Sequence, residues 1–496
     1  MEDLRKLVQI VTTRGQKSFP LIETKAKGNS KETELFIRIK KGELKSDKEA
    51  ADSLYNCAPD DSRLKMLKSR LRKKLLNHLF FLDFSDERLK ISHRYEYECL
   101  TLLFQGRTLM NVGEYRISVK LLQNALKLAE EVEITSTIIS CLETLLKNYS
   151  LTFNSNFYYK TSKELEKYRK LATAENEAEG LYYTARLELN KSVLSKRKYL
   201  PTLQKTLDRL LELWKETNSP TIFDFYYILN ISNQELQGNF SEILNMTILS
   251  EKLLEEGKIN KKRFDSRYNK FITVYAYLRV KEYNKGLTFA EANIEAFNRS
   301  TNNWFAFMEN YMLLAMHAGR YELAARIYDE VAENSFFKKI TVNAQERWML
   351  YSSYLYFVNP SKELLRKSYF KKLLSSIPEY SKDKQGFNVA ILVLQFLYHV
   401  QQRNLDVLAN LIESVKKYAG RHLRENFSQR SLYFFKLLVL VVKADLDYKE
   451  ALHKGQELYQ GIQATPVPGD AYAEIEIIPY EQLWNILLKT LEKLEK

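Results

Sequence analysis

A dense run of basic residues near the start of the sequence is the feature best suited to bind a charged ligand. Between Arg63 and Lys74, seven of twelve residues are basic and none is acidic. The basic residues are Arg63, Lys65, Lys68, Arg70, Arg72, Lys73 and Lys74. Leucines share one helical face of this segment, namely Leu64, Leu67, Leu71, Leu75 and Leu82. A helix with one cationic side can neutralise phosphates and release their counterions.

Two interpretations of this helix stay open. Two shorter predicted helices precede it, an order that resembles a helix-turn-helix DNA reader and predicts nucleic-acid binding. The link from Asn56 to Asp61 is longer than the usual turn, however, and a helix of about 20 residues is long for DNA recognition. The alternative is a solvated amphipathic helix that packs the N-terminal helices against the rest of the chain.

Signatures of catalysis are missing from the sequence. It contains no GxxxxGK[ST], GxGxxG or GxSxG motif. None of the six histidines lies three to five residues from another, so the helical metal-binding spacing is absent. His317 and His399 stand among apolar residues of predicted helices, where core or groove positions are expected. The sequence therefore predicts a protein that is not an enzyme and has no cofactor and no metal.

Composition favours a helical cytoplasmic protein. The chain has 496 residues but only 15 glycines and 9 prolines, which argues against turn-rich β architectures. Its three cysteines include no CxxC pair, as expected in a reducing compartment. No apolar run approaches the about 20 residues that a membrane helix needs, so no membrane contact is expected. The net charge of +14 favours an acidic partner without proving one.

A helical hairpin recurs along the chain. In Leu102–Glu131 and in Tyr311–Val331, two helically periodic segments flank a turn glycine, Gly113 or Gly319, and an aromatic residue follows two positions later. Aligning further hairpins on that position gives residues 38 to 44 apart. They are Tyr115, Phe157, Tyr199, Phe240, Tyr283, Tyr321, Ser361, Leu405 and Tyr448. A fixed period of this size is typical of a solenoid.

These hairpins resemble tetratricopeptide repeats, which are about 34 residues long. The matched features are the turn glycine, the aromatic residue and small residues such as Gly106 and Ala125. With a period near 42 residues, each helix would be about one turn longer than in that family. The resemblance implies an all-α fold with a right-handed α-solenoid of about nine helix-turn-helix repeats. Its concave face would be lined by the first helices of the hairpins.

Mapping the family's groove positions onto this chain gives candidate partner-binding residues. The aromatic and apolar candidates are Tyr149, Phe271, Tyr275, Leu313 and Met316. Asn230, Asn269 and Asn310 lie in the same predicted first helices, where asparagine amides could hold a peptide backbone. The longer repeats allow a second interpretation, in which a shifted register makes these residues part of the core. Both interpretations stay open.

The ends of the chain depart from the period, so we expect three domains, 1–94, 95–463 and 464–496. The first would contain helices over Leu4–Thr13, Lys31–Lys41, Asp47–Tyr55 and Ser62–Leu82, the third of them begun by a capping box of Ser46 and Glu49. Pro201 is expected to open a helix. Ala464–Asp470 predicts a linker, followed by a last helix over Tyr480–Lys496.

The function that these features favour is a scaffold or adaptor that holds a protein or peptide in the solenoid groove. The alternative is a transcription regulator, in which the N-terminal helices bind DNA and the repeats sense a peptide or partner. The first rests on the family resemblance and the second on the basic helix.

Overall fold

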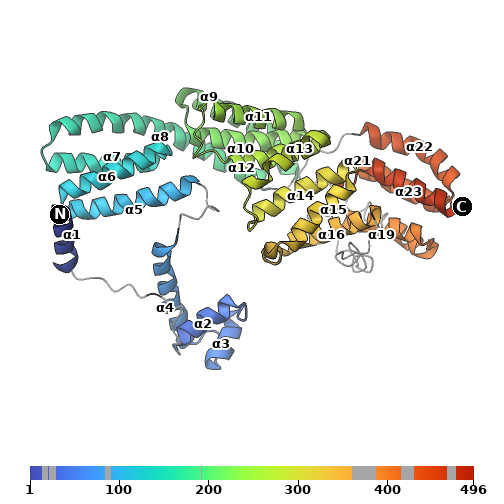
Figure 1. Ribbon diagram of the computed structural model, residues 1–496, viewed down its shortest axis with the longest axis horizontal. Coiled ribbons are helices and arrows are strands. Elements are labelled where there is room, and N and C mark those ends of the chain that lie inside the picture. Colours follow the sequence, from blue (N-terminus) through green and yellow to red (C-terminus); the bar gives the residue numbers. More distant parts are fainter. Residues whose placement is uncertain are drawn as a thin grey trace. The chain divides into compact units, whose positions relative to one another are not determined.

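The computed structural model describes residues 1–13, 21, 30–83, 91–191, 193–359, 387–414, 429–465 and 476–495. Within these ranges every regular element is a helix, as Figure 1 shows, and no strand occurs. The expected all-α class is confirmed for this part of the chain. Two compact units are distinguished. Unit 1 comprises Met1–Leu128 and Glu143–Tyr158, and unit 2 comprises Ala129–Leu142 and Tyr159–Lys496.

The helices at the start of unit 1 follow the sequence prediction closely. They are α1 (Glu2–Thr13), α2 (Lys31–Lys40), α3 (Asp47–Tyr55) and α4 (Ser62–His78), followed by the 3-10 turn η1 (Leu79–Phe81). The predicted capping box begins α3: the Ser46 hydroxyl accepts from the Glu49 N–H, and the Glu49 carboxylate accepts from the Ser46 N–H. The prediction extends α4 to Leu82, whereas the α-helix ends at His78, because its last turns have no buried face to stabilise them.

The helices α2, α3 and α4 form a small core of their own. Leu35 of α2, Leu54 of α3 and Leu64 and Leu67 of α4 are buried together. The Lys31 ammonium donates to the carbonyl of Leu54 at 2.7 Å, which ties the start of α2 to the end of α3. This core fixes which side of α4 faces inward.

The first hairpin of the repeat lies in unit 1. Helix α5 (Ile91–Asn111) leads into α6 (Tyr115–Glu131), which α7 (Thr135–Leu151) and α8 (Ser155–Leu189) follow. The turn between α5 and α6 contains Gly113, whose φ of 86° is costly for any other residue. Gly106 lets the two helices approach, because a Cβ there would stand 2.8 Å from Cγ of Leu122. The Ser118 hydroxyl also donates to the carbonyl of Gly106 at 2.7 Å.

Unit 2 continues with helices that pack against their neighbours in sequence from α9 to α16 and from α21 to α23 (Figure 1). These helices are α9 (Val193–Thr217), α10 (Pro220–Gln237), α11 (Phe240–Glu255), α12 (Ser266–Arg279), α13 (Tyr283–Asn293), α14 (Asn302–His317), α15 (Tyr321–Glu333), α16 (Val342–Val358), α19 (Phe387–Gln401), α21 (Gln429–Lys443), α22 (Tyr448–Ala464) and α23 (Tyr480–Glu495). Residues 405–414 are also helical, and η2 (Ile294–Ala296) and η3 (Ser335–Lys339) are 3-10 turns.

The aligned aromatic positions mark the starts of second helices. Helices α6, α11, α13, α15 and α22 begin at Tyr115, Phe240, Tyr283, Tyr321 and Tyr448 respectively. The helical stretch 405–414 begins at the aligned Leu405, and α8 begins two residues before Phe157. Ser361 lies outside the described residues. Tyr199 is the exception, because it lies inside α9, so the sequence pattern located most of the described second-helix starts.

Two elements differ from the repeat pattern. Helix α8 runs unbroken for 35 residues where the pattern predicts two helices, because the segment 172–180 is rich in helix-forming Ala and Glu and contains no proline. Helix α9 begins at Val193 and contains Pro201 in its interior, so the expectation that Pro201 opens a helix was wrong. Tyr199 and Leu200 pack in the same cluster as Leu203, and this packing extends the helix before the proline.

Side-chain hydrogen bonds link helices that are 36 to 42 residues apart in sequence. The bonded pairs are Arg107–Thr144, Tyr227–Asn269, Tyr275–Glu235, Arg347–Glu309, Tyr351–Glu309 and Tyr354–Ala390. These bonds place corresponding turns of successive first helices side by side. Their spacing agrees with the period found in the sequence.

A buried arginine fastens the C-terminal segment of unit 2. Arg430 of α21 is almost fully buried and forms ion pairs with Glu476 and Glu481, both at 2.7 Å. It also donates to the carbonyl of Ile462 at 2.7 Å. The ring of Tyr480 stacks on Phe434 with 4.4 Å between centroids. Of the predicted linker, only residues 464 and 465 are described; 466–470 lie outside the described residues.

Candidate partner-binding surfaces

Half of the predicted groove residues belong to the core. Asn269, Leu313, Met316 and Tyr149 are buried, so they cannot offer side chains to a partner. The Asn269 amide donates to the carbonyl of Thr247, and its oxygen accepts from the Tyr227 hydroxyl. For these four residues the burial favours the core interpretation, because neighbouring helices cover the faces on which they lie.

The other predicted groove residues are half-buried. Asn230, Phe271, Tyr275 and Asn310 retain part of their surface. The Tyr275 hydroxyl donates to the Glu235 carboxylate at 2.7 Å, and its ring meets Phe240 edge-on at 6.0 Å. The amide of Asn230 accepts from Gln234 at 3.3 Å. The structure does not bring these residues together as an exposed apolar groove; they sit between packed helices.

A strongly exposed apolar surface occurs instead on α5. Tyr97, Leu100 and Phe104 project from one face of this helix, and the side chain of Phe104 is 73% exposed. The opposite face of α5 packs into the protein through Leu103 and Leu109. We call Tyr97, Leu100 and Phe104 the α5 surface. Our sequence analysis did not predict this surface. Its residues are three and four positions apart, however, which is the spacing that places side chains on one face of a helix.

The α5 surface lies on a helix that is held firmly in place. The guanidinium of Arg107 donates to the Thr144 hydroxyl at 3.1 Å and so joins α5 to α7. The Cys99 thiol is fully buried and donates to the carbonyl of Ala125. Burial raises the pKa of Cys99 to about 11, so this thiol is not a reactive nucleophile. The surface is therefore preformed rather than dependent on binding.

The turn between α7 and α8 also exposes aromatic side chains. Leu151, Phe153, Phe157 and Tyr158 are all exposed, and Phe153 is 94% exposed. Phe153 has φ of 53°, a left-handed backbone conformation that is uncommon for a bulky residue. The ring of Phe157 stacks on Tyr149 at 5.4 Å. We call these four exposed residues the aromatic knob.

The basic helix is partly neutralised within the molecule. Arg63 pairs with Asp61 at 2.8 Å, and Lys68 pairs with Asp47 at 2.7 Å. Arg70 and Lys74 both pair with Glu32 of α2, at 2.7 and 2.5 Å. Hydrogen bonds from Lys74 and Arg70 lower the pKa of Glu32 below its usual value. Four of the seven predicted nucleic-acid contacts therefore already have acidic partners.

The remaining three cations of α4 point away from its core. Lys65, Arg72 and Lys73 are exposed, and none of them forms an ion pair with another described residue. Of the leucines expected to share one helical face, Leu64, Leu67 and Leu71 are buried. Leu75 is exposed, and Leu82 is exposed beyond the end of α4 at His78. The exposed apolar residues in and after the last turn of α4 are Leu75, Leu76, Leu79, Phe80, Phe81 and Leu82.

His317, one of the two histidines expected in first helices, occupies a structural position at the end of α14. Nε2 of His317 is 2.6 Å from the carbonyl oxygen of Glu476, an acceptor, so Nε2 carries the proton. Burial lowers the pKa of His317 to about 4. The ring also meets Tyr283 edge-on at 5.5 Å. Among the described residues, no group of His, Cys, Asp and Glu side chains is arranged to hold a metal ion.

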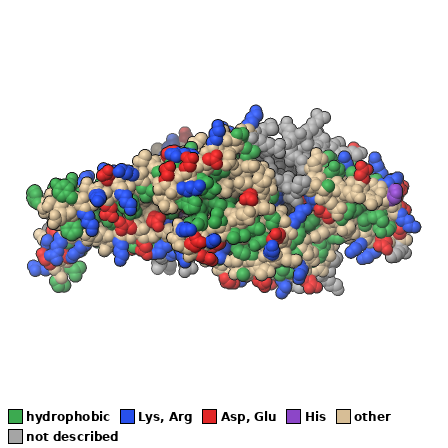
Figure 2. Space-filling model, turned by 90° about the horizontal axis from the view of Figure 1, so that it is seen from above, with side chains coloured by type: hydrophobic (Ala, Val, Ile, Leu, Met, Phe, Trp, Pro, Cys, Tyr) green, Lys and Arg blue, Asp and Glu red, His purple; other side chains and the backbone are tan. Residues whose placement is uncertain are grey.

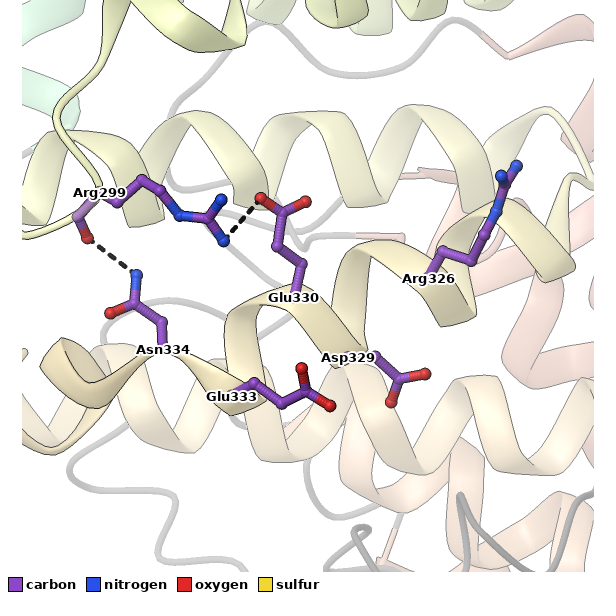
Figure 3. A pocket seen from close by; sticks show the side chains of 6 residues that line it. All are labelled: Arg299, Arg326, Asp329, Glu330, Glu333 and Asn334. Atoms are coloured by element: carbon purple, nitrogen blue, oxygen red, sulfur yellow. Dashed lines mark hydrogen bonds and ion pairs between the residues drawn. The ribbon is translucent and has the colours of Figure 1, made fainter.

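A polar pocket in unit 2 lies along α15 (Figure 3). The Arg299 guanidinium pairs with Glu330 at 2.9 Å, and the Asn334 amide donates to the carbonyl of Arg299 at 2.8 Å. Asp329 and Glu333 also line it. Because its walls are charged and hydrogen-bonded within the molecule, this pocket offers no apolar anchor for a ligand. Figure 2 shows that hydrophobic side chains nevertheless reach the molecular surface in several places.

The chain was compared with known protein families, curated proteins and solved structures, and none of them matches it. No helix in the described ranges is both long enough and apolar enough to span a bilayer. With no matching protein, the function is argued from the exposed surfaces of unit 1, namely the α5 surface and the cations of α4.

Proposed function

We propose that this chain is a cytoplasmic, non-enzymatic adaptor that binds a partner protein through tetratricopeptide-like repeats. In this proposal, residues 1–94 precede a right-handed solenoid of about nine hairpins over 95–463, and residues 464–496 close its end. The starts of the second helices and the hydrogen bonds between residues 36 to 42 apart support the repeat. Such repeats leave extended surfaces on which partners bind.

The α5 surface is the observation that carries the proposal. Tyr97, Leu100 and Phe104 lie exposed on a first helix, the element that lines the binding face in the proposed repeat. Burying a large apolar side chain fully contributes roughly 1.5–3 kcal/mol, so three neighbouring residues can anchor a partner. Aromatic residues are also enriched among those that dominate binding energy at protein interfaces. The α5 surface replaces the groove residues expected from the sequence as the proposed contact site.

The test is capture of partner proteins from the native cells with tagged full-length chain, in parallel samples with and without nuclease. One variant carries Leu100→Ser and Phe104→Ser. The matched control carries Ile248→Ser and Leu249→Ser on α11, whose side chains are 54% and 48% exposed. Both variants lose two exposed apolar residues and keep their backbone contacts, so both should retain wild-type helical content.

The adaptor proposal predicts that one or more proteins bind the wild-type chain and the α11 control but are lost from the α5 variant. Loss of two anchors should weaken binding by about 2–4 kcal/mol, enough to remove the partner from a wash. If the α5 variant captures the same proteins as the wild type, the α5 surface does not bind them. If nuclease removes every bound protein, the adaptor proposal fails.

A transcription regulator is the second candidate, and the exposed cations of α4 favour it. If Lys65, Arg72 and Lys73 each contact one phosphate, a plot of the logarithm of affinity against the logarithm of salt concentration should have a slope of about −2.7. The test measures binding of the full-length chain to duplex DNA over a salt series. The charge-reversal variant is Lys65→Glu, Arg72→Glu and Lys73→Glu.

A matched control separates specific contacts from net charge. Lys252, Lys285 and Lys454 are exposed and pair with acidic neighbours on or beside their own helices in unit 2. Reversing these three to Glu changes the net charge by the same amount. The regulator candidate predicts lost affinity and a flatter salt slope only for the α4 variant. Equal losses in both variants, or no salt-dependent binding by the wild type, would exclude it.

A further inference from the structure

We propose that the aromatic knob is a second contact point, which inserts into an apolar pocket rimmed by acidic side chains on the adaptor's partner protein. This inference rests on the proposed adaptor function but concerns a different surface from that of α5. The knob consists of Leu151, Phe153, Phe157 and Tyr158, all of them exposed. Its geometry and its surrounding charge each point to the same kind of partner.

The left-handed backbone at Phe153 costs free energy, which the turn recovers only in part through the hydrogen bonds from the Phe153 N–H to the Ser150 carbonyl and from the Asn154 N–H to the Tyr149 carbonyl. A left-handed backbone costs a residue with a side chain roughly 1–2 kcal/mol, and glycine would adopt it freely. Phe153 nonetheless occupies this position with its ring almost entirely in solvent. A strained residue that contributes no packing is a candidate for a functional role. An inserted phenylalanine ring would recover this cost through burial.

The knob is rigidly held at its base. The Tyr149 hydroxyl accepts from the Gln123 amide of α6 at 3.2 Å, and the Tyr149 ring is buried. Phe157 stacks on that ring, so the start of α8 is fixed to α7. Because Phe157 is already held against Tyr149, little conformational entropy is lost at this ring when the knob enters a pocket.

The charge around the knob is uniformly positive along the chain. Between Glu143 and Glu164 there are three lysines, Lys147, Lys160 and Lys163, and no acidic residue. All three are exposed. Lys147 lies one turn before Leu151 in α7, and Lys160 lies three residues after Phe157 in α8. Complementary charge at the rim of an interface speeds association and disfavours wrong partners, so an acidic rim fits this surface.

A protein pocket suits this surface better than a membrane or a nucleic acid. Single-stranded nucleic acids bind in basic grooves that follow the backbone over several nucleotides. The knob projects from a turn. Peripheral membrane binding uses long amphipathic faces or lipid anchors, because a few residues bind too weakly. A projecting aromatic residue with a charged rim matches the anchor-in-pocket arrangement of protein interfaces.

The experiment places the photo-crosslinker p-benzoylphenylalanine, which adds a benzoyl group to the exposed ring, at position 153 of the full-length chain in its native cells. A matched position is Tyr183 of α8, which is also exposed. The proposal predicts a discrete protein adduct from position 153 and none from position 183. Adding Lys147→Glu and Lys160→Glu should reduce the adduct about tenfold, equivalent to about 1.4 kcal/mol. The crosslinked peptide should lie next to acidic residues of the partner.

Several outcomes would overturn the proposal. They are no adduct at position 153, an adduct that survives charge reversal, or a crosslinked peptide without acidic neighbours. Binding of the purified chain to phosphatidylserine vesicles or to a thymidine oligonucleotide, lost on Phe153→Ser, would assign the knob to a membrane or to nucleic acid. Crosslinking from position 104 distinguishes the two proposals. An adduct at position 104 without one at position 153 would support the adaptor function and contradict only the proposed role of the aromatic knob.

Discussion

Helices α5 and α14 are both first helices of hairpins with the same turn signature, yet their environments differ. In α14, Trp304, Phe307, Met312 and Met316 are buried on every side, and α12, α13 and α15 pack around it. In α5, one face is buried and Phe104 on another face is exposed. The comparison teaches that the turn signature encodes the hairpin, whereas the neighbours of the hairpin decide which face stays open.

The largest expected effect comes from the buried arginine of unit 2. Changing Arg430→Met leaves the carboxylates of Glu476 and Glu481 without their cation in a buried site. We expect the free energy of unfolding to fall by about 3–5 kcal/mol. The measurement is the shift of the urea unfolding curve. The control is Arg299→Met, whose ion pair with Glu330 is exposed and should contribute under about 1 kcal/mol. An equal loss of stability in the two variants would show that the ion pairs of Arg430 contribute no more than an exposed ion pair.

Truncation of one side chain in each first helix sharpens the comparison. Met316→Ala removes a fully buried side chain of α14 and should cost about 2–5 kcal/mol. Phe104→Ala removes an exposed side chain of α5 and should change stability by less than about 0.5 kcal/mol. Urea unfolding followed by circular dichroism measures both. A large loss for Phe104→Ala would mean that α5 buries this face in solution.

Close packing around α14 depends on a glycine of α13. A Cβ at Gly286 would stand 2.8 Å from Cδ2 of Leu314 and from Cβ of Tyr277. Gly286→Ala should therefore destabilise the protein by about 1–3 kcal/mol through overpacking. Gly180 of α8 has open space at the same position, so Gly180→Ala should stabilise by about 0.5–1 kcal/mol. The two melting temperatures should move in opposite directions; movement in the same direction would contradict this account.

A further expected effect is a pH dependence of stability at the end of α14. The pKa of His317 is lowered from 6.5 to about 4 by burial, so below pH 6.5 the unfolded chain binds a proton that the folded chain does not. This histidine should therefore lower stability as pH falls from about 6.5 to about 4. The measurement compares urea midpoints of the wild type and His317→Gln over this range. Parallel pH profiles would show that His317 stays solvated.

Local features of the fold were predictable because they depend on few residues. The capping box of Ser46 and Glu49 fixed the start of α3, and Gly113 and Gly319 fixed turns that need positive φ. The aromatic alignment located second helices such as α11 and α22. Each of these features depends on residues within a single hairpin, so a local sequence pattern is enough to predict it.

Burial and charge pairing were less predictable because they depend on distant residues. Asn269 is buried, and its side chain is hydrogen-bonded to Tyr227, which lies 42 residues earlier in the chain. Glu32 neutralises Arg70 across 38 residues, which a local count of basic residues does not reveal. The α5 surface was visible as a second apolar stripe, but only the structure shows that its three side chains are exposed.

The central claim is that the α5 surface binds a partner protein, and the most direct test is calorimetric titration with the captured partner. The account predicts that Phe104→Ser weakens binding about tenfold or more, equivalent to about 1.4 kcal/mol, while Ile248→Ser leaves the dissociation constant unchanged. Equal affinities for the wild type and both variants would contradict it. Such a result would place the partner on another surface of the chain.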